Sequence, residues 1–389
     1  MKIHEDTLEL IKYGLDVELL PFFEYDRANY RVMLDRFHNM IRAKNWEDAK
    51  VLHDKLAVIE IFQFEKELNV LFSLFSSRFL LATGEVEKAD NVLCTFDDKL
   101  DSLNQVQLYH YYFDKGLFYF LKSDCKSAYD YFLKAYDLTE YGLRKYMELY
   151  HYLAYCCDEL GYVIKSITFI DEVKLLKSVD KTIVDEIYLD NLLGKNYRRL
   201  GYIQKSKEYL DKAYPMALEN YKNDASEYNK NLLGAVLCNY GCIYIKNKTF
   251  HIANEYLDKS SNYITRENPL YLELIYQKTL VSVTMKNPLI GSKLISEGKE
   301  LAKNNEIYLK MFEALDIMLN INDDLARKME TEIIPYLMEN NCFYPALDYA
   351  MFIRNYHKGK LRPPTIRVGD ISDVICTIND RMHEGEIAI

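Results

Sequence analysis

Small and large apolar residues recur along this chain in one fixed order. Residues 109–138 show it in full: a large residue, a small one, an aromatic, a polar turn, and then small, aromatic and small residues. The residues at these positions are Tyr112, Gly116, Tyr119, Ser123, Ala128, Phe132 and Ala135. The spacing on each side of the turn places the apolar residues on one face of a helix. The stretch therefore predicts two antiparallel helices, which we call A and B, joined by a tight turn.

The same order recurs along most of the chain. The expected turns lie at residues 44, 84, 123, 161, 201, 248 and 286, and a last helix pair centres on Asn341 and Ala346. Successive turns are 38 to 40 residues apart, with one interval of 47. The long interval falls at the polar stretch 219–231, where we expect longer helices and a longer loop between them. A minimal tetratricopeptide repeat (TPR) has 34 residues. The sequence thus predicts an all-α fold, a TPR superhelix of about seven to nine helix pairs with longer helices than the minimal repeat.

Three glycines have a specific place in this prediction. Gly116, Gly194 and Gly241 each occupy the small position of an A helix. Glycine costs about 1 kcal/mol in a helix interior relative to alanine. We therefore expect each of them at a close contact between an A helix and its B helix.

Composition excludes several classes of protein. Of the 389 residues, 49% are apolar and 28% are charged, and the formal net charge is −10. That charge argues against a broad basic face for nucleic acid. The N-terminus lacks the pattern of a signal peptide, and no apolar run approaches the ~18 residues of a membrane helix. Eight cysteines without a secretion signal fit reduced thiols, so we expect a cytoplasmic protein that does not contact a membrane.

Two cysteines, Cys238 and Cys242, lie four residues apart and raise the question of a metal or redox site. The repeat order places both on an A helix, next to Gly241. A metal site needs further ligands that converge on the pair, and we expect buried thiols instead. No phosphate-binding loop, metalloprotease motif or nucleophile elbow occurs. The sequence therefore predicts no catalytic residues, no metal and no cofactor.

The A helices of a TPR array line its concave wall. Several wall positions of this chain carry polar side chains, so we expect the wall to bind a ligand. These positions are His110, Asp114, His151, Tyr152, Tyr155, Asp158, Tyr188, Asn191, Lys195, Arg198, Asn239, Tyr276 and Gln277. An asparagine amide offers a donor and an acceptor, as a peptide backbone does. Asn191 and Asn239 are the leading candidates for holding an extended peptide, and Lys195 and Arg198 for meeting a carboxylate. The alternative for any single residue is a solvated helix face.

The chain also resembles a known family of proteins. The phrase LCNYGCIYIKNKTFHIANEYLDKS, the long repeats, and the C-terminal stretches EIYLKMFEALDIML and YPALDYAMFIRNYHKGK are similar to the peptide-pheromone receptors of Gram-positive bacteria, the Rap, NprR, PlcR, PrgX and Rgg group. The resemblance spans about residues 30–360. It implies an intracellular quorum-sensing regulator that binds a short linear signalling peptide in its groove. Asn239 matches the family position that holds the peptide backbone, and Asn191 lies one position earlier in its repeat.

Two departures from the family bear on activity. No helix-turn-helix is recognisable, so the chain is either a Rap-like or truncated member, or a DNA-binding domain has been removed. In the helix where some Rap proteins use a glutamine for phosphatase activity, this chain has Lys66, with Gln63 one turn away. We expect no enzyme activity, although a Rap-type phosphatase is not excluded.

The expected organisation has three parts. Residues 1–60 form an N-terminal helical segment or first repeat, and residues 61–360 form the repeat domain with its groove. Residues 361–389 carry Ile371, Val374, Ile375 and Ile378 on one helical stripe. This segment either caps the last repeat or pairs with a second copy of the chain.

Three functions remain open from the sequence. The first is a peptide sensor that changes its interaction with a regulatory protein partner, or with DNA through a missing domain. The second is a constitutive TPR scaffold, and the third is a phosphatase of the Rap kind. The sequence does not give the identity of the peptide, the partner or the sign of regulation.

Overall fold

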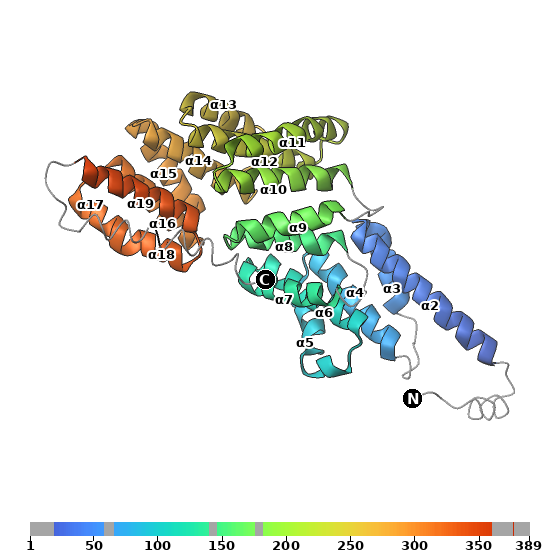
Figure 1. The fold of residues 1–389 in the computed structure, drawn as a ribbon. Helices are drawn as coiled ribbons and strands as arrows, with labels where there is room; N and C mark the ends of the chain where they lie inside the picture. Colours follow the sequence, from blue (N-terminus) through green and yellow to red (C-terminus); the bar gives the residue numbers. More distant parts are fainter. Residues whose placement is uncertain (1–18, 58–65, 140–145, 176–181, 360–375, 377–389) are drawn as a thin grey trace. The chain divides into compact units, whose positions relative to one another are not determined.

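The structure, a computed structural model, describes residues 19–57, 66–139, 146–175, 182–359 and 376. Within these ranges the ordered elements are helices, and no strand occurs. The helices form two compact units, residues 1–149 and residues 150–389 (Figure 1). The expected all-α TPR fold is confirmed, and each unit is described by itself below.

Unit 1 consists of antiparallel helix pairs. Its helices are α2 (Leu19–Arg42), α3 (Trp46–Ala57), α4 (Lys66–Ala82), α5 (Val86–Cys94), α6 (Gln105–Leu121) and α7 (Cys125–Thr139), with a 3-10 turn η1 (Asp97–Ser102) between α5 and α6. Helix α6 begins with a capping box in which Asn104 and Gln107 exchange side-chain and backbone hydrogen bonds. Leu34, Phe37 and Leu56 are almost fully buried where the first two pairs meet.

Unit 2 continues the same arrangement. Its helices are α8 (Met147–Glu159), which crosses the boundary, α9 (Val163–Leu175), α10 (Ile183–Arg199), α11 (Ile203–Asn223), α12 (Glu227–Lys246), α13 (Phe250–Ser261), α14 (Leu270–Thr284), α15 (Pro288–Leu301), α16 (Glu306–Leu319), α17 (Asp323–Lys328), η2 (Met329–Ile333), α18 (Ile334–Glu339) and α19 (Phe343–Lys358). Helices α10, α12 and α14 pack on their own B helices, α11, α13 and α15, and α10, α12, α14 and α16 pack in succession on one another.

The backbone confirms the positions of the turns. In the described residues, positive φ angles occur only at the predicted turns and at Asn341, the predicted centre of the last pair. These residues are Lys44, Gly84, Ser123, Gly161, Gly201, Lys248, Lys286 and Asn341, with φ from 55° to 84°. A residue in the left-handed region ends a helix and reverses the chain. Eight such turns in the described residues fit the predicted seven to nine pairs.

The three glycines lie where the close approach was expected. A Cβ atom on Gly116 would come within 2.5 Å of the Phe132 ring, and one on Gly194 within 2.6 Å of Leu210. A Cβ atom on Gly241 would come within 2.7 Å of Leu257 and 3.4 Å of the Ala253 carbonyl oxygen. All three lie inside A helices and face their own B helices, so the predicted packing is confirmed.

The long interval between turns lengthens helices rather than a loop. Helix α11 has 21 residues and α12 has 20. Only three residues separate them, and Ser226 caps α12 by accepting a hydrogen bond from the Asn229 backbone N–H. The expectation of longer helices is correct, whereas a longer loop is not found. Pro215 lies inside α11.

Two positions that the repeat order placed on a ligand-binding wall are core residues of unit 1. His110 and Asp114 on α6 are 4% and 0% exposed. Asp114 pairs with Arg78 of α4 and accepts a hydrogen bond from Ser77 Oγ at 2.9 Å. Burial raises the pKa of Asp114 to about 6, although the Arg78 guanidinium opposes the shift. The interpretation of these two residues as wall positions is therefore wrong.

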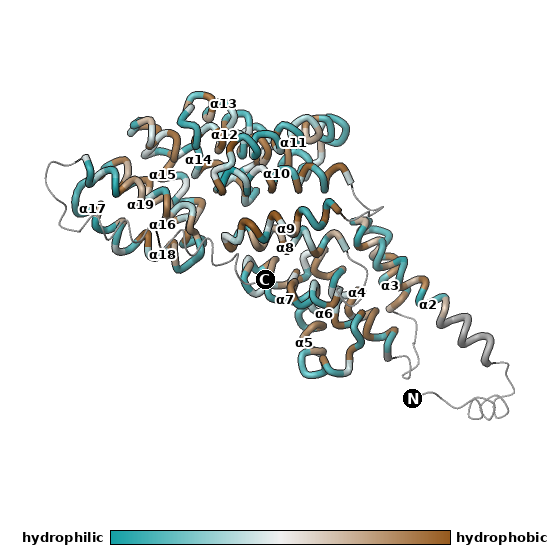
Figure 2. The backbone as a smooth tube through the Cα atoms, viewed as in Figure 1, coloured by the Kyte–Doolittle hydropathy of each residue, from teal (hydrophilic) through white to brown (hydrophobic). Residues whose placement is uncertain are grey.

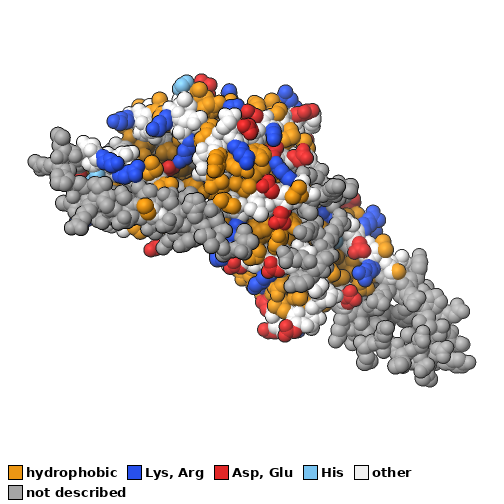
Figure 3. Space-filling model, viewed as in Figure 1, with side chains coloured by type: hydrophobic (Ala, Val, Ile, Leu, Met, Phe, Trp, Pro, Cys, Tyr) orange, Lys and Arg blue, Asp and Glu red, His pale blue; other side chains and the backbone are white. Residues whose placement is uncertain are grey.

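Hydrophobic and hydrophilic residues alternate along the helices of both units (Figure 2). On the face drawn in Figure 3, the described Lys and Arg side chains are interspersed with Asp and Glu. None of the helices in the described ranges is both long enough and apolar enough to cross a membrane. The stripe predicted at 371–378, and the boundary at 360–361, lie outside the described residues.

Gly241→Ala tests the helix packing. Overpacking costs about 1–3 kcal/mol, and the better helix propensity of alanine returns about 1 kcal/mol. We expect a net loss of about 1 kcal/mol in the free energy of unfolding, measured by urea denaturation. Leu257→Val in the same background should recover part of that loss, because it makes room for the new methyl group. A Gly241→Ala variant as stable as the parent would contradict the close approach.

Candidate functional site

The candidate site is a row of side chains on the A helices of unit 2. Helix α10 sets the pattern with Tyr188, Asn191, Lys195 and Arg198, at intervals of three and four residues. This spacing puts them on one helix face. Helices α8, α12 and α14 contribute stripes of the same kind. We call this set the inner face: His151, Tyr155, Asp158, Tyr188, Asn191, Lys195, Arg198, Asn239, Cys242, Glu273 and Gln277.

The two leading asparagines meet at the centre of the inner face. Asn239 Nδ2 of α12 donates to Asn191 Oδ1 of α10 at 3.0 Å. Both side chains are half-buried. One bond uses one donor and one acceptor of the pair, so an acceptor on Asn239 and a donor on Asn191 remain. That is the complement of one peptide unit, and the structure joins residues that the sequence placed one repeat apart.

A buried carboxylate joins α8 to α10. The Asp158 side chain has no exposed surface and pairs with Lys195 Nζ at 2.6 Å and with Arg199 Nη1. Burial alone would raise the pKa of Asp158, but the Arg199 and Lys195 charges outweigh burial, and the pKa lies below its usual value. Lys195 also reaches Glu159 at 3.4 Å. Lys195, expected to meet a ligand carboxylate, is therefore already neutralised within the protein.

Arg198 differs from its two basic neighbours. Within the described residues it makes no ion pair, and its Nε is buried without a hydrogen-bond partner. It lies close enough to Cys242 to influence that thiol. The hydrogen bond with Cys238 has the largest effect and lowers the pKa of Cys242; burial opposes it, Arg198 lowers it further and Glu273 raises it. Arg198 and Glu273 therefore both lie near the Cys242 side of α12.

Glu273 lies on α14 with two neutral hydrogen-bond donors. Gln277 Nε2 donates to one carboxylate oxygen at 2.6 Å, and Tyr308 Oη of α16 donates to the other at 2.6 Å. No cation in the described residues forms an ion pair with it. Gln277, expected to contact a peptide, is 8% exposed and serves here to position Glu273.

Tyr276 belongs to the core where α14 packs against α16 and α19. It is 6% exposed, and its hydroxyl lies 2.8 Å from the Tyr349 hydroxyl of α19. Its ring packs edge-on against Phe312. This placement gives Tyr276 a packing role. Helix α19 also reaches α12 through an ion pair between Lys246 and Asp348 at 2.8 Å.

Aromatic side chains surround the α8 end of the inner face. His151 Nδ1 lies 3.8 Å from an Asp185 oxygen, and its ring lies 5.7 Å from the Tyr188 ring. Burial raises the pKa of Tyr188 well above its usual value, and Tyr155, Asp158, Tyr228 and Tyr152 raise it further. The structure thus brings together the predicted residues of α8 and α10, and these rings can cover an apolar ligand side chain.

Cys238 and Cys242 are buried thiols on α12, as the repeat order predicts. Their side chains pack with Ala253 and Leu257 of α13. Within the described ranges, His, Cys, Asp and Glu do not gather in groups of three suited to a metal ion.

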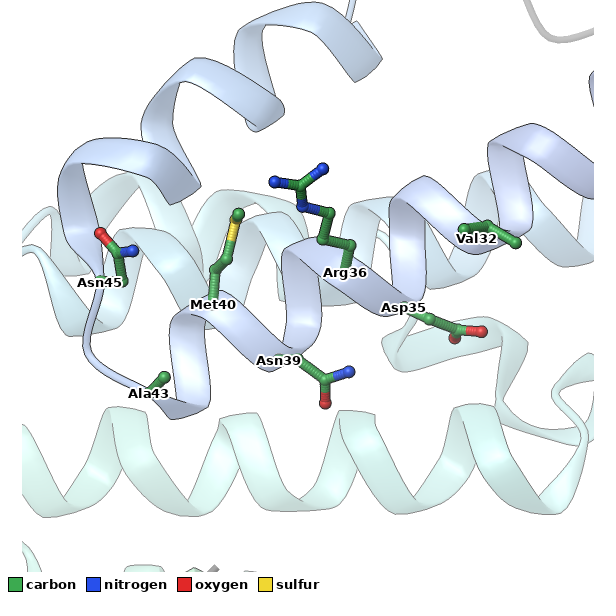
Figure 4. A pocket seen from close by; sticks show the side chains of 7 residues that line it. All are labelled: Val32, Asp35, Arg36, Asn39, Met40, Ala43 and Asn45. Atoms are coloured by element: carbon green, nitrogen blue, oxygen red, sulfur yellow. The ribbon is translucent and has the colours of Figure 1, made fainter.

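A pocket in the described residues lies elsewhere, in unit 1. It has a volume of about 480 Å³ and is lined by Val32, Asp35, Arg36, Asn39, Met40 and Ala43 of α2, with Asn45 of the following turn (Figure 4). One helix and its turn supply the whole lining, so polar groups from different elements do not converge in this pocket. We therefore do not consider it a candidate active site.

Three residues that belong to the inner face or bond to its side chains were not predicted from the sequence: Arg199, Glu273 and Tyr308. Glu273 precedes Gln277 by four residues, so its place on the same stripe could have been predicted. Arg199 lies one residue beyond the stripe, and its pairing with Asp158 depends on the contact between α8 and α10. No local signal indicates Tyr308.

Comparison with known proteins shows which of them are similar in sequence to this chain. No family model matches the chain. The chain is 22% identical over 379 residues to the transcriptional activator NprA of Geobacillus stearothermophilus, covering 92% of this chain and 90% of NprA. It is 22% identical over 315 residues to response regulator aspartate phosphatase A of Bacillus subtilis (strain 168), covering 75% of this chain and 78% of that protein.

Two solved structures share the fold. A Rap protein complexed with competence and sporulation factor has a TM-score of 0.72 at 14% identity, covering 92% of this chain and 99% of the Rap chain. NprR in complex with its cognate peptide NprX has a TM-score of 0.71 at 18% identity, covering 91% and 98%. The chain is similar in sequence to NprA and to the B. subtilis phosphatase, and it shares its fold with the Rap and NprR structures. The resemblance predicted from its repeats is confirmed.

Asp158→Ala tests the buried charge cluster. Removing the carboxylate leaves Arg199 and Lys195 with too little negative charge, and breaking such buried pairs costs about 3–5 kcal/mol. We expect a loss near 3 kcal/mol in the free energy of unfolding, because Lys195 keeps Glu159 as a partner.

The pH dependence gives an independent check on the same residue. The pKa of Asp158 is lowered on folding, so its stabilisation is present above the unfolded value of about 4 and is lost as the pH falls through the folded value. The Asp158→Asn variant has no carboxylate to protonate at this position. Its free energy of unfolding should therefore fall less between pH 5 and pH 3 than that of the parent. Parallel acid-denaturation curves for the two proteins would contradict the cluster.

Proposed function

We propose that this protein is a regulator that binds a short linear peptide along the inner face of unit 2. The observation that carries the proposal is the hydrogen bond between Asn239 and Asn191. Two half-buried amides, held on adjacent A helices, present the donor and the acceptor that a peptide backbone needs. The peptide complexes of the Rap and NprR relatives, which share the fold, support this reading.

The inner face suits a peptide better than a compact ligand. Its polar groups extend over α8, α10, α12 and α14 instead of converging on one point. Each side chain except Arg198 is already paired or packed with a neighbour. A ligand that binds here has to exchange hydrogen bonds along a row, and an extended chain can do so with one peptide unit after another.

Binding of the peptide changes the interaction with a regulatory partner. The names of the two relatives support two kinds of regulated process. NprA is a transcriptional activator, and the B. subtilis relative is a response regulator phosphatase. The partner is accordingly a regulatory protein, or DNA reached through a further domain. We place the protein in the cytoplasm, where both kinds of partner are found.

Phosphatase activity is the second candidate, and the B. subtilis relative favours it. Lys66 occupies the expected catalytic position, and Gln63, one turn away, lies outside the described residues. Incubation of the protein with a phosphorylated response regulator tests this candidate, and faster loss of phosphate than from the regulator alone would support it.

Asn239→Ala tests the peptide-binding proposal. We expect a loss of about 1–3 kcal/mol in binding, which is about five- to 150-fold in affinity, because a buried backbone group of the peptide loses its partner. The loss should be similar for peptides with different side chains. The measurement is calorimetry with a peptide identified by mass spectrometry among those that copurify with the protein.

The same chain offers a matched control. Asn254 lies on α13, a B helix, and Asn254→Ala makes the identical chemical change away from the inner face. We expect it to bind like the parent. Equal affinities for folded Asn239→Ala and Asn254→Ala would remove the inner face from the mechanism and favour a constitutive scaffold.

A further inference from the structure

We propose that Arg198 and Glu273 select the ligand by charge, so that the inner face takes a peptide with a carboxylate group over α10 and a cationic group over α14. This inference rests on the proposed function. It specifies the chemistry of the peptide and the direction in which it lies.

Arg198 is the cation that the protein leaves for a ligand. Its neighbours Lys195 and Arg199 share Asp158 and Glu159, whereas Arg198 makes no ion pair in the described part of the chain. It follows Asn191 by seven residues on the same helix face, so it lies two turns further along α10. Its Nε is buried without a hydrogen-bond partner. A guanidinium in this position binds a carboxylate through charge-assisted hydrogen bonds.

Glu273 is the matching anion. Its two oxygens accept one hydrogen bond each, from Gln277 and from Tyr308, and both donors are neutral. These bonds fix the orientation of the carboxylate without cancelling its charge. A carboxylate has about four acceptor sites, so a cationic group of a ligand can still bind.

The two charges lie on different helices. Arg198 is on α10 and Glu273 on α14, and α12 packs between these two helices. A ligand that meets both charges therefore crosses α12.

The amide pair lies where α10 meets α12. Asn191 is on the helix of Arg198, and Asn239 is on α12. The backbone of the ligand therefore contacts the amides while the charged groups occupy the ends. A short linear peptide has one carboxylate and one ammonium at its termini, and acidic and basic side chains supply the same two groups.

The test is affinity selection from a synthetic library of linear peptides of five to eight residues with free termini, read out by mass spectrometry. Parent protein, Arg198→Gln, Glu273→Gln and the Asn254→Ala control are compared, and circular dichroism confirms that each is folded. Glutamine keeps hydrogen-bonding capacity at both positions and removes only the charge.

We expect parent and control to select peptides that share one order of acidic and basic groups along the chain. Neutralising the carboxylate of a selected peptide should weaken binding about 10- to 150-fold in the parent and little in Arg198→Gln. Neutralising the cationic group should behave in the same way with Glu273→Gln. Versions with an amidated C-terminus or an acetylated N-terminus show whether the termini or side chains supply the charges.

The possible failures are distinct. Selected peptides without a common charge order, or equal losses in parent and variants, would overturn this inference and leave the peptide groove intact. Selection of no peptide by folded parent protein would overturn the proposed function together with it.

Discussion

The structure depends on the close approach of the two helices in each pair. Glycine at the A-helix position lets Leu257, Leu210 or Phe132 of the B helix occupy the space that a Cβ atom would fill. A left-handed residue at each turn reverses the chain within a few residues. Because each pair buries its apolar residues internally and against the next pair, the remaining face of the A helices needs no apolar residues for stability. The inner face can therefore be polar while the helix pairs keep their apolar packing.

The inner face is already internally bonded, and this affects how it can bind. Asp158 and Glu159 pair with Lys195 and Arg199, Asn239 donates a hydrogen bond to Asn191, and Tyr308 and Gln277 hold Glu273. These interactions fix the side chains before a ligand arrives, so less conformational entropy is lost on binding. The exchange of one hydrogen bond for another contributes little net free energy. Affinity must therefore come from apolar contacts with the tyrosines and from the charges that the protein leaves uncompensated.

The fold was largely predictable because its signals are local. Each turn, each small residue and the length of α11 and α12 can be recognised within the stretch between two neighbouring turns. The partners of the site residues depend on contacts between helices that are distant in sequence, such as Tyr308 with Glu273 or Tyr349 with Tyr276. Residue type alone placed Asn191 and Asn239 on the same surface. Residue type could not show that the two asparagines hydrogen-bond each other or that Asp158 forms an ion pair with Lys195. It also could not show that His110 and Asp114 are buried.

The most direct test of the account is a crystal structure of the protein with its copurified peptide. The account predicts that the peptide crosses α10 and α12 in extended form and that the amides of Asn239 and Asn191 hydrogen-bond its backbone. The bond between the two asparagines should be lengthened or replaced. A peptide bound on the B helices, with the Asn239–Asn191 hydrogen bond unchanged at about 3.0 Å, would contradict the central claim.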